Sequence, residues 1–253
     1  MQRLSGRTCL ISGASSGFGA HFARLVASEG ARVVLGARRR DRVEALAREI
    51  EREGGSALAV ALDVTDEASV IAAFDAAAVA FGPVDTVIAN AGVSVTGRAT
   101  DIPADELRVL FDTNLLGLYL TAREGARRMI AAGSRGTGRG RILLVGSMGA
   151  LAPFPGGTAY CASKAGVASL ARSFASEWVR QGINVNVIQP GFIKTELAGT
   201  WFDSEGGKAQ IAGFQRRRLQ PIESLDEPVV FFCSDASAHT SGAVFSIDDG
   251  QSL

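Results

Sequence analysis

Short runs of apolar and β-branched residues recur along the chain, and longer segments with helical spacing of apolar residues separate them. The runs predict buried strands at Thr8–Ser12, Arg32–Gly36, Ala57–Leu62, Val84–Asn90, Arg141–Gly146, Ile183–Gln189 and Ala243–Ile247. The amphipathic segments predict helices over about 18–29, 40–53, 66–80, 104–132, 158–181 and 225–234. Because this alternation is typical of βαβ units, we expect an α/β fold. It would be a doubly wound parallel sheet of about seven strands with helices on both faces.

Two stretches interrupt this alternation. Gly133–Gly140 is rich in glycine and arginine, which favours a solvated surface loop before the next strand. Residues 192–222 are long, partly aromatic and weakly periodic, and long loops in compact domains often serve as lids. We therefore expect a substrate lid at 192–222. No change in composition and no long linker divides the chain, so residues 1–253 are predicted to form a single domain.

Composition and charge exclude several classes of protein. With 47% hydrophobic and 21% charged residues, the chain has the balance of a folded protein rather than a disordered one. Lys+Arg and Asp+Glu number 26 each, so no basic excess indicates nucleic-acid binding. Three scattered cysteines and two histidines support neither a disulfide framework nor a metal site. No uninterrupted apolar run has the length of a membrane span, and no signal-peptide pattern is visible, so we expect a cytoplasmic protein that binds no membrane.

A glycine-rich turn, Gly13–Gly19, follows the first predicted strand and precedes a helix. Glycines here permit a tight turn and close approach of a pyrophosphate to the backbone, while the helix N-terminus offers unpaired N–H groups. The spacing G-x-x-x-G-x-G differs from both G-x-G-x-x-G and the P-loop. A dinucleotide site is the functional interpretation, and a glycine-rich turn without a ligand is the alternative.

The end of the second strand bears on the choice of dinucleotide. An NAD site usually has Asp or Glu there to bind the ribose hydroxyls, but this strand ends at Gly36-Ala37 and three arginines follow. Guanidinium groups can bind a 2′-phosphate with two hydrogen bonds. We therefore expect NADP(H), with Arg38 as the first phosphate ligand, Arg39 as the second and Arg40 on the surface. The alternative is that the arginines only begin a solvated helix.

Three residues have the chemistry of a reaction centre. Tyr160 and Lys164 are four positions apart in a predicted helix and so share one face. An ammonium group next to a tyrosine lowers its pKa from about 10 and so makes it a better acid/base near neutrality. Ser147 follows a predicted strand, at the sheet edge where ligands bind, and could donate to a carbonyl oxygen. An amphipathic helix with an extended surface lysine would explain the Tyr160–Lys164 spacing equally well.

Taken with further motifs, these residues resemble those of the short-chain dehydrogenase/reductase family over essentially the whole chain. The motifs occur in the family's order and spacing: Ser12-Gly13-x-x-x-Gly17-x-Gly19, Asp63-Val64, Asn90-Ala91-Gly92, Asn114, Ser147, Tyr160-x-x-x-Lys164, and Pro190-Gly191 with Thr195. The resemblance implies a Rossmann-like domain that interconverts a ketone and a secondary alcohol by hydride transfer. Phe18, Ala89 and Gly146 depart from the family's usual residues, but none of them removes a catalytic group.

The resemblance also implies roles for individual residues. Tyr160 would be the general acid/base, and Ser147 would bind the substrate oxygen. Lys164 would hold the nicotinamide ribose and lower the pKa of Tyr160, while Asn114 would kink its helix and order a water in a proton relay. The implied cofactor contacts, besides Arg38, Arg39, Tyr160 and Lys164, are Gly13, Ser15, Ser16, Gly17, Phe18, Gly19, Asp63, Val64, Asn90, Ala91, Gly92, Pro190, Gly191, Ile193 and Thr195.

Apolar residues surround the expected substrate site and favour an apolar or bulky carbonyl compound. They are Met148, Leu151 and Phe154 after Ser147, and Phe192, Leu197, Trp201, Phe202, Ile211 and Phe214 in the expected lid. The cationic run Arg216-Arg217-Arg218 could instead bind an acidic substrate group, or it could be a solvated helix end.

Three further alternatives concern function and assembly. The same fold could be a non-catalytic dinucleotide-binding sensor or scaffold, although the intact Tyr/Lys/Ser/Asn set argues against it. A 3-oxoacyl thioester is an alternative substrate, which the Ser176-Glu177 pair disfavours because an arginine is expected before that glutamate. Family members of this length commonly form tetramers, so the resemblance implies a homotetramer, with a dimer as the second choice.

Overall fold

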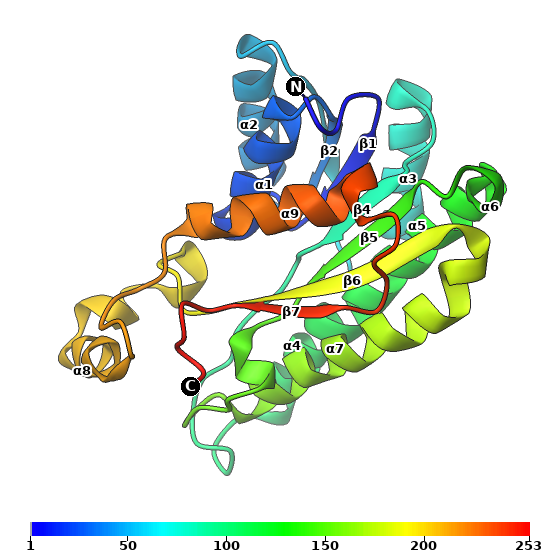
Figure 1. Ribbon diagram of the computed structural model, residues 1–253. Coiled ribbons are helices and arrows are strands. Elements are labelled where there is room, and N and C mark those ends of the chain that lie inside the picture. The colour runs from blue at the N-terminus through cyan, green and yellow to red at the C-terminus, as the bar shows by residue number, and fades with distance from the viewer. Residues whose placement is uncertain (1) are drawn as a thin grey trace.

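Seven parallel strands form the central sheet in the computed structural model, which describes residues 2–253 (Figure 1). They are β1 (Thr8–Ser12), β2 (Arg32–Ala37), β3 (Ser56–Ala61), β4 (Thr86–Ala89), β5 (Gly140–Val145), β6 (Ile183–Pro190) and β7 (Val244–Ile247). Their spatial order is β3-β2-β1-β4-β5-β6-β7, so the direction of winding reverses between β1 and β4. The predicted doubly wound parallel sheet is confirmed. In such sheets ligands bind at the carboxyl ends of the strands, beside the reversal.

Helices cover both faces of the sheet, which explains the continuous apolar runs of the central strands. On one face, α1 (Gly17–Ser28), α2 (Arg40–Arg52) and α9 (Asp226–Cys233) pack over the sheet. On the other face lie α3 (Glu67–Phe81), α5 (Leu118–Ala131) and α7 (Thr158–Trp178). Every residue of β1, β4, β5 and β6 is buried, so the sheet is a rigid support for the loops at its carboxyl edge.

The helix predicted over 104–132 is interrupted in its middle. Helix α4 (Ala104–Phe111) leads into a π-helical turn, Asp112–Gly117, and only then does α5 begin. Gly117 allows this turn to approach the loop after β3, since a Cβ there would lie 2.6 Å from Cγ2 of Val64. The wider turn places Asn114 in the interior, and single π-turns are frequent at functional sites.

The surface loop predicted at Gly133–Gly140 is exposed at most positions, but it is not free of regular structure. The stretch contains the short helix α6 (Ser134–Thr137), and its last residue begins β5. Ser134 is buried, and its hydroxyl donates to the carbonyl oxygen of Gln181 at 2.6 Å. The stretch is therefore packed against the turn that follows α7, a contact between distant segments that local composition does not reveal.

Residues 192–222 are more regular than their weak periodicity suggested. They contain 3-10 turns at Glu196–Ala198 and Trp201–Asp203 and the helix α8 (Glu205–Gly213). Only Gly207 of α8 is buried, so the helix has no apolar stripe that a periodicity search could detect. Helix α8 projects away from the sheet beyond the carboxyl ends of β6 and β7 (Figure 1).

Two expectations from composition concern the chain as a whole. Among residues 2–253, no helix combines the length and apolar character that a membrane crossing requires. The same residues contain no cluster of His, Cys, Asp and Glu side chains arranged to hold a metal ion. Cys9, Cys161 and Cys233 are all buried free thiols.

Candidate active site

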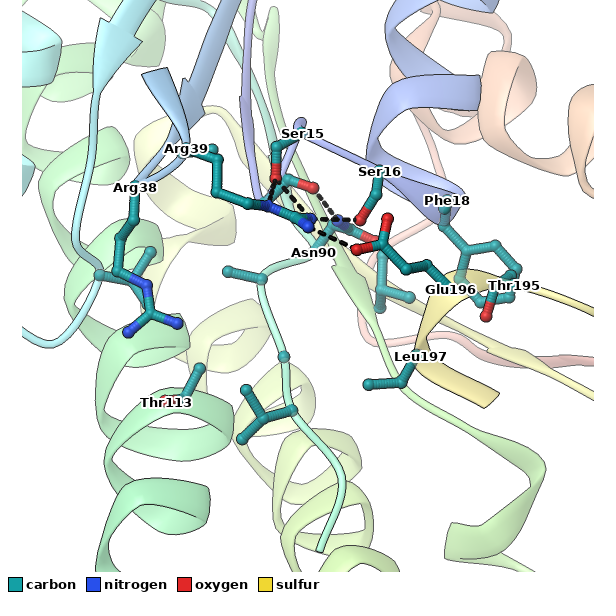
Figure 2. Close-up of a pocket in the computed structure, with 18 of the residues that line it drawn as sticks. Ser15, Ser16, Phe18, Arg38, Arg39, Asn90, Thr113, Thr195, Glu196 and Leu197 are labelled. Atoms are coloured by element: carbon teal, nitrogen blue, oxygen red, sulfur yellow. Dashed lines mark hydrogen bonds and ion pairs between the residues drawn. The ribbon is translucent and has the colours of Figure 1, made fainter. Parts of the chain in front are cut away.

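A cleft of about 510 Å³ lies at the carboxyl ends of the strands, where the strand order reverses (Figure 2). The structure brings most of the expected cofactor residues together along it. Those that line the cleft are Gly13, Ser15, Ser16, Gly17, Phe18, Arg38, Arg39, Asp63, Val64, Asn90, Ala91, Gly92, Tyr160, Lys164 and Thr195. The cleft therefore combines residues from the glycine turn, the second and third strand ends and helix α7.

The glycine turn is packed tightly against the loop after β4. Gly13 has φ +71°, and a Cβ on it would lie 2.8 Å from Cα of Ala91. A Cβ on Gly19 would overlap the carbonyl oxygen of Gly13. The side-chain amide of Asn90 donates to the carbonyl oxygen of Ser12 at 3.0 Å, so it braces the turn. This packing leaves the N-terminus of α1 open to the cleft, where an anion is favoured.

The two arginines after β2 have different surroundings. Arg39 donates to the hydroxyl of Ser16 at 2.7 Å and to that of Ser15, and its Nη1 is 2.5 Å from Glu196. Arg42 approaches the same carboxylate at 2.7 Å. Arg38 extends toward Thr113, away from this ion-paired cluster (Figure 2). The strand itself ends at Ala37 without a carboxylate.

At the third strand end, Asp63 holds a tight turn. Its Oδ1 accepts hydrogen bonds from the backbone N–H and the hydroxyl of Thr65, at 3.0 and 2.7 Å. The Thr65 hydroxyl in particular lowers the pKa of Asp63, so this carboxyl is ionised near neutrality. Val64 packs against the π-helical turn at Gly117 and closes this side of the cleft.

Tyr160 and Lys164 lie on one face of α7, as their spacing predicts. The Lys164 ammonium donates to the carbonyl oxygen of Val145 at 2.9 Å and lies 5.7 Å from the centre of the Tyr160 ring. Burial lowers the pKa of Lys164 to about 8. Burial also raises the pKa of Tyr160, and a hydrogen bond with Ser147 opposes this rise. Burial has a larger effect on the pKa of Tyr160 than the neighbouring side chains have, so the phenol is protonated near pH 7. The resemblance had implied a lowered pKa for Tyr160.

Asn114 and Ser147 fix the geometry around this pair. Asn114 is fully buried, and its side chain exchanges two hydrogen bonds with the backbone of Val93, at 2.8 and 2.9 Å. It also donates to the hydroxyl of Ser163 on α7 at 3.1 Å. A Cβ on Gly92 would lie 3.3 Å from Oδ1 of Asn114 and 3.5 Å from Nζ of Lys164, so both side chains approach Gly92. Ser147 accepts from the N–H of Gly149 at 3.1 Å, which orients its hydroxyl.

Most of the residues expected to bind substrate do not line the cleft. Of the seven principal candidates, only Leu197 lines the cleft. Phe154, Phe192, Phe202 and Phe214 instead form an aromatic cluster, with neighbouring ring centres 5.5 to 5.9 Å apart. The ring of Phe154 is 6.3 Å from that of Tyr160, so this cluster lies directly beside the reaction centre.

Other candidates lie away from the cleft. Leu151 and Trp201 are 58% and 52% exposed, and the Trp201 indole donates to Gln210 within the same segment. Met148 and Ile193 are buried, and Pro190 is the last residue of β6. Gly191 packs against the C-terminal segment of the chain.

Several residues that line the cleft were not anticipated. They are Ala37, Leu62, Val93, Thr113, Val145, Gly146 and Glu196. Val145 and Gly146 end a predicted strand, so their position at the sheet edge was a usable signal. Glu196 gave no such signal, because its partner Arg39 is 157 positions away in the sequence.

Comparison with known proteins gives consistent results. A family model described as short chain dehydrogenase matches residues 7–206. D-threitol dehydrogenase from Mycolicibacterium smegmatis is 34% identical over 251 residues, which cover 99% of this chain and 95% of that protein. Cis-4-hydroxycyclohexanecarboxylate dehydrogenase from Sinomonas cyclohexanicum is 38% identical over 254 residues, with 96% of each chain covered.

Solved structures show the same likeness in three dimensions. A gluconate 5-dehydrogenase from Burkholderia cenocepacia, in complex with NADP and tartrate, aligns with a TM-score of 0.92 and 30% identity, covering 99% of this chain and 96% of that one. A 3-ketoacyl-(acyl-carrier-protein) reductase from Brucella melitensis, complexed with NADH, aligns with a TM-score of 0.89 and 33% identity, covering 99% and 100%. The two complexes thus contain different nicotinamide dinucleotides.

Proposed function

The chain belongs to the short-chain dehydrogenase/reductase family of oxidoreductases, and from that premise we propose that it is an NADP(H)-dependent enzyme that interconverts a ketone and a secondary alcohol. The observation that carries this proposal is the placement of Tyr160 and the buried Lys164 on one face of α7, where both line the cleft that also contains the glycine turn. Ser147 follows Gly146, which lines the same cleft, and interacts with the Tyr160 hydroxyl strongly enough to oppose the rise of its pKa. The hydroxyl groups of Ser147 and Tyr160 would both bind the carbonyl oxygen of the substrate.

The residues of the cleft fit a dinucleotide. The glycine turn and the N-terminus of α1 would hold the pyrophosphate. Gly13 and Gly19 allow the tight turn that this requires, because a Cβ on either residue would clash with the neighbouring backbone. Asp63 and Val64 would contact the adenine, and Lys164 the nicotinamide ribose. When bound, the reduced cofactor supplies a hydride to the carbonyl carbon.

The preference for NADP(H) over NAD(H) rests on charge. Ala37 offers no carboxylate for ribose hydroxyls and no repulsion toward a 2′-phosphate. Arg38 extends into the cleft, whereas Arg39 is engaged by Ser15, Ser16 and Glu196 (Figure 2). We therefore assign the 2′-phosphate mainly to Arg38, with Arg39 as a second ligand.

Proton transfer is the task of Tyr160. Its raised pKa keeps the phenol protonated near neutrality, which suits the donor of a proton to the developing alkoxide. Ser147 stabilises the same oxygen by a hydrogen bond. Lys164, whose pKa of about 8 lets it exchange a proton near neutrality, would resupply Tyr160. Asn114 fixes the loop and helix beside Lys164, and a water ordered by its turn would complete the relay.

The substrate is proposed to be an apolar, bulky or ring-containing carbonyl compound. The aromatic cluster beside Tyr160 supports this assignment, because aromatic rings offer a large apolar contact surface and few hydrogen bonds. One relative is named cis-4-hydroxycyclohexanecarboxylate dehydrogenase, and the compound in that name has a six-membered carbocyclic ring. The lid formed by residues 192–222 would close over this substrate.

A homotetramer is proposed for the assembly. Exposed apolar side chains gather along α4, the π-helical turn and α5, namely Val109, Phe111, Leu116 and Tyr119. A second group, Phe231 and Phe245, is exposed on α9 and β7. Two separate apolar faces on one chain can support a tetramer with two kinds of interface. Light scattering at micromolar concentration would test this, and a monomer would contradict it.

The proposed reaction is tested by a turnover screen of the purified protein with NADPH. The panel contains aryl ketones, alicyclic ketones, keto acids and a β-ketoacyl thioester. We expect the highest kcat/KM for an aryl or alicyclic ketone. A clear preference for a charged compound would overturn the apolar assignment, and no turnover of any ketone would overturn the proposed reaction.

A further inference from the structure

The last six residues of the chain, Asp248–Leu253, contact both ends of the lid. They follow β7, and the C-terminus lies at the end of the sheet from which the lid projects (Figure 1). The N–H of Gly191 donates to the carbonyl oxygen of Ile247 at 2.9 Å, so the lid leaves the sheet directly beside the start of this tail. The packing is close, since a Cβ on Gly191 would lie 2.8 Å from Cα of Asp248.

At the beginning of the lid, the tail binds through Gln251. Its Oε1 accepts the backbone N–H of Phe192 at 2.6 Å, and its Nε2 lies 3.4 Å from the carbonyl oxygen of the same residue. The ring of Phe192 is the member of the aromatic cluster that contacts all three others. One amide side chain of the tail thus fixes the backbone of the central aromatic residue.

At the end of the lid, the tail binds through Asp249. Its Oδ2 accepts a hydrogen bond from Nε of Arg218 at 2.9 Å, and its Oδ1 forms an ion pair with Arg216, 3.1 Å from the Nε of that residue. The Asp249 side chain is only 14% exposed, although the arginines are mostly in solvent. The hydrogen bond from Arg218 lowers the pKa of Asp249, so the carboxylate is charged near neutrality. The arginine cluster is therefore tied to the tail of the chain itself.

The backbone at this junction is strained on both sides. Arg217 has φ +48° and Asp249 has φ +54°, and within the described residues 2–253 these are the two non-glycine positions with positive φ. Glycine adopts this conformation without cost, whereas a side chain destabilises it, and such conformations persist where surrounding contacts impose them. The carboxylate of Asp249 and the two flanking arginines are those contacts here.

We propose that the tail Asp248–Leu253 is a brace that sets the position of the lid, and that Asp249 and Gln251 are positioning residues for the carbonyl substrate. The proposal rests on the proposed function of residues 192–222 as a substrate lid. Neither Asp249 nor Gln251 is among the residues that line the cleft. They act through the backbone of Phe192 and through the Arg216–Arg218 turn. Loosening the brace should therefore weaken capture of the ketone and leave cofactor binding unchanged.

The first readout is hydrogen exchange of lid amides in the whole protein. Asp249→Asn keeps the side-chain shape and the tolerance for positive φ but removes the charge. Asp249→Gly also removes the carboxylate, and it relieves the backbone strain at positive φ. It therefore serves as a second variant in case Asp249→Asn does not fold. Gln251→Ala removes the amide, whereas Gln251→Glu retains an oxygen that can accept from Phe192. Asp75→Asn is the matched control, because it removes an ion pair with Arg128 on α5, far from the lid.

We expect exchange in peptides covering 192–214 to accelerate about tenfold in Asp249→Asn, Asp249→Gly and Gln251→Ala. Exchange in Gln251→Glu and in the Asp75 control should stay near the wild-type rate. Wild-type exchange rates in all three tail variants would overturn the brace.

The second readout separates the brace from the role of the lid. In the three tail variants we expect KM for an aryl ketone to rise about 3- to 10-fold, with kcat and the NADPH dissociation constant within twofold of wild type. If lid exchange accelerates but KM does not change, the substrate-positioning role is overturned, and the assignment of 192–222 as a substrate lid fails with it.

Discussion

The wall of the cleft and the proposed lid, residues 192–222, are built in opposite ways. The wall consists of fully buried parallel strands, a glycine turn packed against the next strand end, and side chains held by backbone atoms, such as Lys164 on Val145. The lid consists of short turns, one short helix without an apolar stripe, and exposed ion pairs such as Lys194–Asp203. The strands of the wall are buried throughout, whereas 192–222 is held by the aromatic cluster around Phe192 and by a few polar contacts.

This difference suggests a division of labour. Groups that transfer protons must be held within a fraction of an ångström, so they belong on rigid elements. A segment that must admit and release substrate is drawn from the less stable parts of a fold. Changes in the wall should therefore act on kcat and on cofactor binding, and changes in the lid on KM for the ketone.

The largest effect is expected at the proton donor. Tyr160→Phe keeps the ring but removes the transferable proton, so kcat should fall by roughly 10²- to 10⁴-fold while NADPH binding stays within a few-fold. Tyr119→Phe, on α5, is the matched control and should retain turnover, since the Tyr119 ring packs on Phe174. Steady-state kinetics and cofactor titration measure both quantities. A Tyr160→Phe enzyme with most of the wild-type kcat would show that the acid/base is another group.

The packing of the glycine turn is tested next. In Gly19→Ala the new Cβ overlaps the carbonyl oxygen of Gly13, and overpacking of this kind costs about 1–3 kcal/mol. If the turn shifts to relieve it, NADPH should bind roughly 10- to 100-fold more weakly. Gly136→Ala is the control, because nothing lies within 4 Å of the added Cβ. Equal NADPH affinity of the two variants would mean that the turn does not shape the cofactor site.

The choice of cofactor depends on Arg38. We expect Arg38→Ala to raise KM for NADPH about tenfold and to leave KM for NADH nearly unchanged, since only NADPH carries the 2′-phosphate. Arg40→Ala should change neither, because Arg40 pairs with Glu44 on the surface. Equal kcat/KM of the wild-type enzyme with the two cofactors would contradict the preference for NADP(H).

The pH dependence follows from Tyr160 and Lys164. Lys164 carries a proton below its pKa of about 8 and loses it above, so kcat for ketone reduction should be level up to about pH 8 and then decline, by at most about tenfold per pH unit. Alcohol oxidation should show the opposite trend, because Tyr160 must lose its proton and burial raises its pKa. Reductive kcat that increases steadily above about pH 8 would contradict this assignment.

The smallest effect is expected in the lid. Phe214 stacks on Phe192 with ring centres 5.5 Å apart. In Phe214→Leu the stacking is lost, so KM for an aryl ketone should rise about 2- to 10-fold with little change in kcat. Phe81→Leu at the end of α3 is the control and should leave KM unchanged. A Phe214→Leu variant with reduced kcat and unchanged KM would place this residue with the wall rather than the lid.

The same contrast explains what the sequence could predict. The strands and helices of the wall follow from local periodicity. The glycine turn and the arginines after β2 follow from their positions at strand ends, and the other expected cleft residues were implied by the family resemblance. Asn114 and Lys164 both approach Gly92, and Lys164 lies 5.7 Å from the centre of the Tyr160 ring. The π-helical turn was anticipated only as a kink, because its width depends on the approach of Gly117 to Val64.

The lid could not be predicted to the same depth. Its contacts join distant positions: Glu196 with Arg39, 157 residues apart, and Gln251 with Phe192, 59 residues apart. Trp201 was expected to line the substrate site but donates a hydrogen bond to Gln210 and is half-exposed. The effect of burial on the pKa of Tyr160 also depends on tertiary packing, which residue spacing along one helix does not contain.

Transfer of labelled hydride tests the proposed reaction most directly. The wild-type enzyme is mixed with NADPH that carries deuterium at the transferable position of the nicotinamide, together with an aryl ketone, and the product is examined by mass spectrometry. We expect a secondary alcohol with one deuterium on the carbinol carbon, formed in step with NADPH consumption. Cofactor binding without any labelled alcohol from the ketone panel would contradict the account and leave this chain a dinucleotide-binding protein without turnover.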